Sequence, residues 1–155
     1  MPIQIIWGND IDTSNKEIEK FIESNVSTIW SDINISKFNG EDTKQVLQAL
    51  DEMLTPPFGE GSRIIVIKNS PILNTKNDEI TNKFEINAKN IPKSTHLVLQ
   101  NIQKPDSRMK STKFIKGFLK EKKAIELSFN LPSMWDKNSQ LKYIQNIAKE
   151  MDIYI

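Results

Sequence analysis

Short, mostly apolar runs alternate along the chain with segments of amphipathic helical spacing. The runs at 3–7, 63–68 and 95–100 have the length of strands, and a shorter one lies at 35–38. Runs with little polar alternation are typical of strands buried on both faces of a parallel sheet. A last apolar segment, 124–129, alternates more regularly, so we expect it at a sheet edge.

Helical patterns separate these strands. Segments 43–54 and 111–121 carry apolar residues three and four positions apart, which places them on one helix face. A further helix is expected after the first strand, with Ser14 as its N-cap and Glu17 completing a capping box. A more polar helix covers 80–91. Strands alternating with helices predict a three-layer α/β domain with a mostly parallel sheet flanked by helices.

The pattern changes after Leu131-Pro132. Residues 137–151 show one amphipathic helix pattern, and 152–155 have the character of a new strand that stops abruptly. The chain has 155 residues, which suits one full domain and not two. We therefore expect an α/β domain over 1–132 and the truncated start of a second, helical domain over 133–155.

Composition narrows the possible chemistry. The formal net charge is +1, so no overall field draws the chain to nucleic acid or membrane. There is no cysteine and one histidine, His96, which excludes a thiolate zinc site and a histidine-based triad. The basic segment 104–113 could contact a phosphate backbone, but such runs are more often solvated helix starts. No signal peptide or membrane-length apolar run is visible.

The loop after the first strand, 8–14, lies where open α/β sheets bind ligands. It lacks the glycine-rich loop ending in Lys-Ser or Lys-Thr that a nucleoside triphosphatase needs, so hydrolysis is not expected. Asp10 and Asp12 could form a magnesium pair, as in receiver domains. Such a site also needs an aspartate where this chain has Asn69-Ser70. We therefore favour solvated residues of a capped loop.

The most informative segment is Thr55-Pro56-Pro57-Phe58-Gly59, which follows the helix at 43–54. The prolines are expected to end that helix, because proline lacks an amide proton and restricts the residue before it. Phe58 stands between Pro57 and Gly59 on a tight turn, where its ring is awkward to bury. An exposed aromatic on a rigid turn is typical of an interface anchor. A hydrophobic cover over the sheet is the alternative, and both interpretations remain open at this stage.

Three motifs occur in a recognisable order. They are Trp7-Gly8-Asn9-Asp10, Thr55-Pro56-Pro57-Phe58-Gly59 before Arg63-Ile64-Ile65-Val66, and Lys104-Pro105-Asp106-Ser107-Arg108-Met109-Lys110 after the strand at 97–100. In this order and spacing, the chain resembles the N-terminal part of the delta subunit of the bacterial DNA polymerase III clamp loader. The Thr-Pro-Pro-Phe-Gly form is most similar to cyanobacterial versions. Trp135 and the helix through 147–150 resemble the start of that family's second domain.

The resemblance implies a fold like that of the clamp loader ATPases, without a phosphate loop. It implies a cytoplasmic, non-catalytic chain that binds the sliding clamp and opens its ring during DNA replication, with no cofactor or metal. Its partners would be the clamp (the beta subunit), delta-prime and the gamma/tau ATPases. DNA would be contacted only within the assembled complex, and no membrane is involved. Arg108 does not stand in the setting of an arginine finger.

The resemblance also implies where the clamp binds. In the family, a Leu-Phe pair at the end of this helix inserts into a hydrophobic pocket of the clamp. Phe58 matches the phenylalanine, whereas Pro57 occupies the leucine position, so Leu54 or Met53 is expected to compensate. Two alternatives remain open from the residues: a phosphate- or nucleotide-binding domain that uses the loop after the first strand, and a stand-alone adaptor that binds another protein through the same tip.

Overall fold

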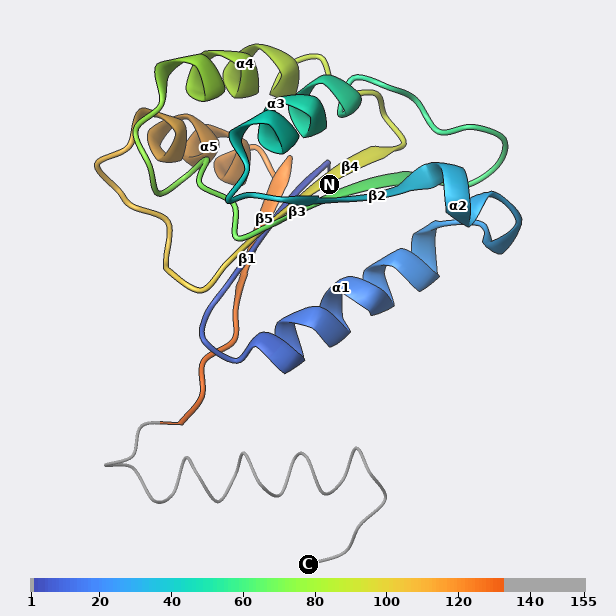
Figure 1. Ribbon diagram of the computed structural model, residues 1–155, viewed down its shortest axis with the longest axis horizontal. Coiled ribbons are helices and arrows are strands. Elements are labelled where there is room, and N and C mark those ends of the chain that lie inside the picture. The colour runs from blue at the N-terminus through green and yellow to red at the C-terminus, as the bar shows by residue number, and fades with distance from the viewer. Residues whose placement is uncertain (1, 133–155) are drawn as a thin grey trace, which may run out of the picture.

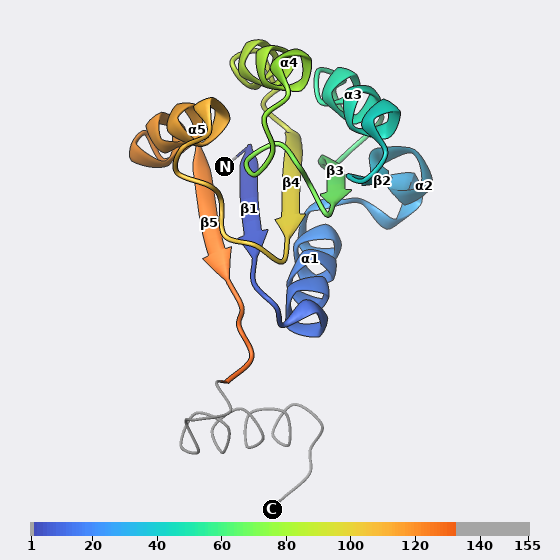
Figure 2. The same ribbon diagram turned by 60° about the vertical axis from the view of Figure 1, so that its left-hand side comes forward.

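A five-stranded sheet forms the centre of the protein, for which a computed structural model describes residues 2–132. The strand order is β2-β3-β4-β1-β5, and every neighbouring pair is parallel. Figure 2 shows the strand arrows of the sheet pointing in one direction. The strands are β1 (Ile3–Trp7), β2 (Ile35–Asn39), β3 (Arg63–Lys68), β4 (Thr95–Asn101) and β5 (Ala124–Ser128).

Helices cover both faces of this sheet (Figure 1). On one side lie α3 (Thr43–Glu52), α4 (Asp78–Ala88) and α5 (Lys110–Lys120), and on the other lies α1 (Ile11–Asn25). Between α1 and β2 the chain makes two short turns, the 3-10 turn η1 (Thr28–Trp30) and α2 (Ser31–Asn34). This arrangement confirms the predicted three-layer α/β fold with a parallel sheet.

The core has two layers, one on each face of the sheet. In β3, Ile65 and Ile67 pack toward α3, α4 and α5, whereas Ile64 and Val66 pack toward α1. All four side chains are fully buried. Because successive strand residues point to opposite faces, a strand covered on both sides is apolar at consecutive positions in its centre. This explains the continuous apolar runs in the sequence.

The first helix begins earlier than the sequence pattern indicated. Asp10, and not Ser14, is the N-cap of α1: its carboxylate accepts from the backbone N–H of Thr13 at 3.2 Å and from the Thr13 hydroxyl at 2.7 Å. Ser14 lies buried inside the first turn. Both residues are good N-caps, and the buried Asp10 holds Thr13 through two hydrogen bonds, so the capping-box assignment was wrong.

The helix before the tip is shorter than predicted. It ends at Glu52, and Met53 is its C-cap. The chain then turns through the bonds Leu54 N–H to Asp51 C=O and Thr55 N–H to Glu52 C=O. The prolines therefore lie beyond the helix end and shape the following loop.

The predicted helix over 137–151 and the second domain over 133–155 lie outside the described residues. Among residues 2–132, no helix combines the length and apolar character needed to cross a membrane.

Candidate functional site: an apolar tip held by Asn34

The loop between α3 and β3 separates buried from exposed apolar residues. Met53 is fully buried in the core, while Leu54 is 41% exposed and Phe58 is 56% exposed. Pro57 is half-buried. Of the four expected contact residues, Met53 therefore has no surface to offer a partner. Phe58 and Leu54 are the two large apolar side chains of this loop that reach solvent.

The backbone of Phe58 is held by one buried side chain. The Asn34 amide donates to the Phe58 carbonyl at 2.7 Å, and its oxygen accepts from the Phe58 N–H at 2.8 Å. Asn34 has no exposed surface. A buried amide that satisfies both backbone groups acts like a neighbouring strand, because buried polar groups need such partners. The phenyl ring can therefore stay in solvent while its backbone is fixed.

The ring itself rests against Trp30. The two ring centroids are 5.0 Å apart with an interplanar angle of 72°, an edge-to-face arrangement that aromatic pairs prefer. Gly59 makes this contact possible. Its φ is +71°, and a Cβ there would lie 2.3 Å from Cε2 of Trp30. Only glycine fits this close approach without displacing the indole.

Arg63 ties the segments around the tip together. Its guanidinium is buried and donates to the Ile33 carbonyl at 2.8 Å and to the Glu52 carboxylate at 3.1 Å. The first bond reaches α2 and the second reaches the end of α3. Because one rigid, planar group bridges both, the start of β3 fixes the two segments that flank the tip.

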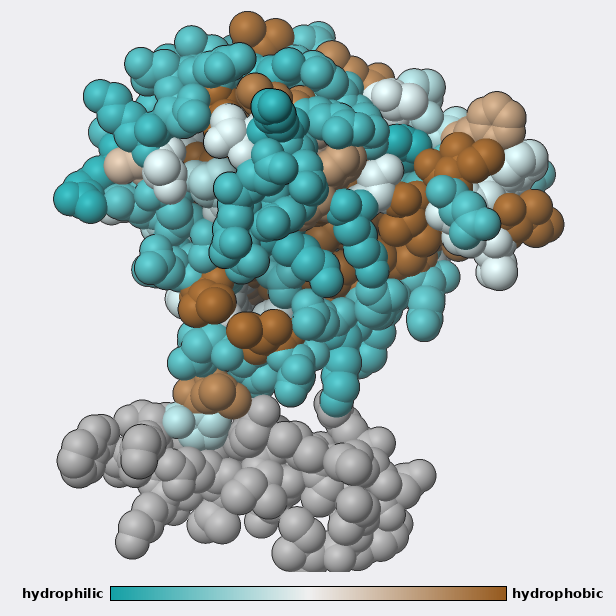
Figure 3. All heavy atoms as spheres, in the orientation of Figure 1, coloured by the Kyte–Doolittle hydropathy of each residue, from teal (hydrophilic) through white to brown (hydrophobic). Residues whose placement is uncertain are grey.

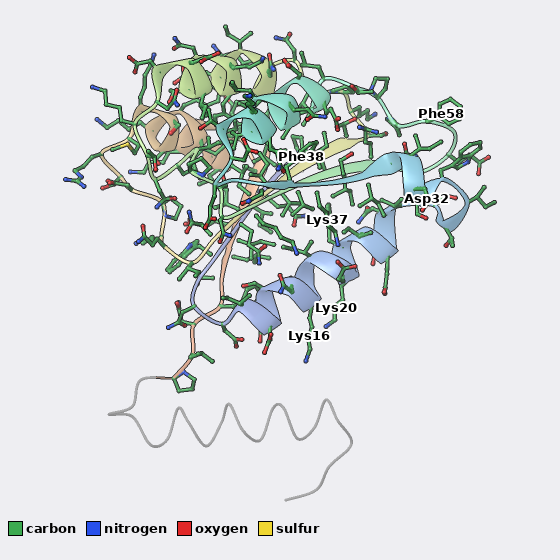
Figure 4. All side chains as sticks on the ribbon, viewed as in Figure 1. Lys16, Lys20, Asp32, Lys37, Phe38 and Phe58 are labelled. Carbon is green, nitrogen blue, oxygen red and sulfur yellow. The ribbon has the colours of Figure 1, made fainter. Side chains whose placement is uncertain are left out.

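Exposed apolar residues also gather beside the tip. Ile29 is 85% exposed and Ile33 is 51% exposed, and they lie on η1 and α2. Figure 3 shows hydrophobic residues at the end of the molecule where these turns project. In Figure 4, Phe58 lies at the end of the molecule where Asp32 marks α2, and far from Lys16 of α1. The turns η1 and α2 are too short to show helical periodicity, so the sequence pattern did not predict a role for the site residues Asn34, Trp30, Ile29 and Ile33.

The loop after β1 is closed by the segment that follows β5. The N–H of Gly8 donates to the carbonyls of Asn101 and Ile102, both at 3.1 Å, and the N–H of Asp10 donates to the Phe129 carbonyl at 3.0 Å. A Cβ on Gly8 would overlap the backbone of Phe129. Because the Gly8 and Asp10 amides already donate, they cannot cradle a phosphate, and the loop also lacks the lysine.

The two aspartates of the possible nucleotide site, Asp10 and Asp12, do not form a metal site. Asp10 is buried in its cap, while Asp12 is exposed on the first turn of α1. The expectation of a capped loop is confirmed, although Asp10 is not solvated. No cluster of three or more His, Asp or Glu side chains within residues 2–132 could hold a metal ion. A hollow of about 230 Å³ does lie at this sheet edge, lined in part by Lys68, Asn69 and Asn101.

The basic segment 104–113 carries an internal ion pair. The Arg108 guanidinium donates through Nε to one oxygen of Asp106 at 3.1 Å and through a terminal nitrogen to the other at 3.0 Å. The backbone N–H of Arg108 adds a third bond at 2.9 Å. The side-chain hydrogen bond from Arg108 lowers the pKa of Asp106, and the same pair raises the pKa of Arg108. This neutralisation makes Arg108 a poor candidate for a trans-acting arginine.

Comparisons with known proteins agree with this fold. The structure is similar to that of the Bacillus subtilis DNA clamp loader delta protein, with a TM-score of 0.75 and 22% sequence identity. The match covers 97% of this chain and 44% of the Bacillus chain, so the protein spans less than half the length of that relative. No curated protein sequence matches the chain. A family model described as "DNA polymerase III, delta subunit" matches residues 5–130. The chain therefore belongs to the DNA polymerase III delta subunit family.

Proposed function

We propose that this chain is the clamp-binding part of a non-catalytic clamp loader delta subunit, and that Phe58 anchors it to the sliding clamp. Binding at this tip would help to open the clamp ring during DNA replication. The observation that carries the proposal is the exposed Phe58 ring on a backbone fixed by Asn34. Family membership supports the clamp as the partner.

The physical properties of the tip suit an anchor. Fully burying a phenylalanine side chain contributes about 1.5–3 kcal/mol, and aromatic residues are enriched among the residues that dominate interface energies. Because Phe58 is already held at its backbone, little conformational freedom remains to be lost on binding. One anchor of this strength suits reversible attachment better than a permanent complex.

The residues around Phe58 contribute unequally to the proposed contact. Leu54 is the exposed aliphatic residue on the α3 side, and half-buried Pro57 fixes the chain before the ring. Met53 supports the loop from the core, so we leave it out of the contact. Other clamp loader subunits, delta-prime and the gamma/tau ATPases, are proposed as partners in the cytoplasm, and DNA is proposed to be met only within that assembly.

Nucleotide binding is the competing function. The occupied amides of the loop after β1 argue against it, whereas the hollow beside Lys68 and Asn101 is the one observation in its favour. Calorimetry with magnesium and ATP separates the two. We expect no saturable heat, and clear saturable binding would favour the nucleotide site.

A pull-down tests the clamp assignment and the adaptor alternative together. The 155-residue chain, immobilised, should retain the sliding clamp of the same organism, and Phe58→Ala should not. Ile86→Ala is the matched control, because Ile86 is 61% exposed on α4, away from the tip. A wild-type chain that fails to retain the clamp would leave the tip to an adaptor role with another protein.

A further inference from the structure

We infer that the turns η1 and α2 supply the second half of the clamp contact, with Ile29 and Ile33 as the aliphatic partners of Phe58. The inference rests on the proposed function of Phe58. It assigns contact residues that lie about 25 to 30 positions earlier in the sequence than the tip. The docking surface is defined here as Ile29, Ile33 and Phe58.

Exposure is the first observation. Ile29 is 85% exposed and Ile33 is 51% exposed, on two consecutive short turns. A single exposed isoleucine on a protein surface needs no explanation. Here two isoleucines lie on the turns whose Trp30 and Asn34 contact Phe58, and Figure 3 shows hydrophobic residues where these turns project. A patch of this kind marks an interaction site.

Rigid continuity with Phe58 is the second observation. Trp30, next to Ile29, packs edge-on against the Phe58 ring at 5.0 Å. Asn34, next to Ile33, holds both backbone groups of Phe58. The two turns and the tip are therefore joined by side-chain contacts of Trp30 and Asn34, the residues that follow the two isoleucines. A partner that buries the Phe58 ring meets a surface on which the isoleucines are already positioned.

Charge indicates what kind of molecule covers this surface. Within 21–36 and 54–62 the charged residues are all acidic: Glu23, Asp32 and Glu60, each exposed. Acidic groups around an apolar patch repel a phosphate backbone, which basic residues must neutralise. The occupant is therefore a protein and not DNA, and its continuity with Phe58 makes it the same sliding clamp.

Clamp affinity measured by surface plasmon resonance tests the inference. We expect the double variant Ile29→Ser, Ile33→Ser to weaken binding about tenfold, as loss of a well-buried interface residue typically does. Because both side chains are exposed, its thermal unfolding should match wild type. Ile29→Ser alone, at the more exposed position, should weaken binding in the same direction. Ile86→Ser on α4 is the control and should leave the affinity unchanged.

The outcomes separate this inference from the proposed function. If Phe58→Ala removes binding while the double isoleucine variant binds like wild type, the two-sided contact is overturned and the Phe58 anchor stands. If Phe58→Ala binds like wild type, Phe58 is not the anchor, and the assignment of Ile29 and Ile33 as its partners in the clamp contact fails as well. Loss of binding in both variants, with the control unchanged, supports the inference.

Discussion

The buried side-chain amide of Asn34 bonds to both backbone polar groups of Phe58. It donates to the Phe58 carbonyl at 2.7 Å and accepts from the Phe58 N–H at 2.8 Å. An amide supplies one donor and one acceptor in a fixed plane, which is the pattern a neighbouring strand would offer. The loop thereby gains strand-like support at Phe58. This relationship explains how a large aromatic ring stays exposed without its loop collapsing onto the core.

Asn34→Ala should therefore loosen the tip. Removing the amide leaves two backbone groups of Phe58 without their partner, at a cost of about 1–3 kcal/mol of unfolding free energy. Amide hydrogen exchange measures the effect directly, and the Phe58 N–H should become poorly protected. Clamp affinity should fall as well. Unchanged protection of that one amide would show that Asn34 does not hold the tip.

Gly59→Ala should disturb the contact between Trp30 and the loop. A left-handed φ costs a non-glycine residue about 1–2 kcal/mol, and the added Cβ would press on the indole at 2.3 Å. The matched control is Gly117→Ala within α5, where a Cβ meets nothing within 4 Å. That variant should be stabilised by about 0.5–1 kcal/mol, since alanine favours a helix. Chemical denaturation of both variants checks the opposite signs.

Met53→Ala and Leu54→Ala should separate packing from binding. Met53 is fully buried, so its truncation should cost about 2–5 kcal/mol of unfolding free energy. Leu54 is 41% exposed, so Leu54→Ala should change stability by less than about 0.5 kcal/mol and should weaken clamp binding. Denaturation and affinity are measured on both. A destabilised Leu54→Ala would place that side chain in the core.

Arg108→Ala should raise the pKa of Asp106. In the folded protein the bonds from Arg108 hold this pKa below the ordinary value of 3.8. The carboxylate therefore favours folding above pH 3.8, and this contribution is lost as the pH falls through the lower folded pKa. NMR titration of the Asp106 carboxyl measures it in wild type and variant. Equal pKa values in the two proteins would contradict the pairing.

Much of the fold could be predicted because its strands are buried on both faces. The predicted bounds of β1 and β3 match the structure, because strands covered on both faces are apolar at most positions and stand out as short apolar runs. The start of α1 could not be predicted reliably. Asp10 and Ser14 are both good cap residues, and only the folded structure shows that Asp10 holds Thr13.

The candidate site was only partly predictable, because residues far apart in the sequence hold it together. The place of Phe58 between proline and glycine made exposure one of two open interpretations, and the structure shows the residue 56% exposed. Its support by Asn34 spans 24 residues, and a contact of that kind leaves no local pattern. The elements η1 and α2 are also too short to show helical periodicity. For this reason the sequence did not predict that Trp30 and Ile29 belong to the site.

Calorimetry of the sliding clamp with wild type and with Phe58→Ala measures directly whether Phe58 anchors the clamp. Thermal unfolding and circular dichroism on the same samples show that the variant is folded, and Ile86→Ala serves as the exposed apolar control. We expect wild type and Ile86→Ala to bind alike and Phe58→Ala to show no measurable binding. A folded Phe58→Ala chain that binds the clamp as tightly as wild type would contradict the anchor role of Phe58.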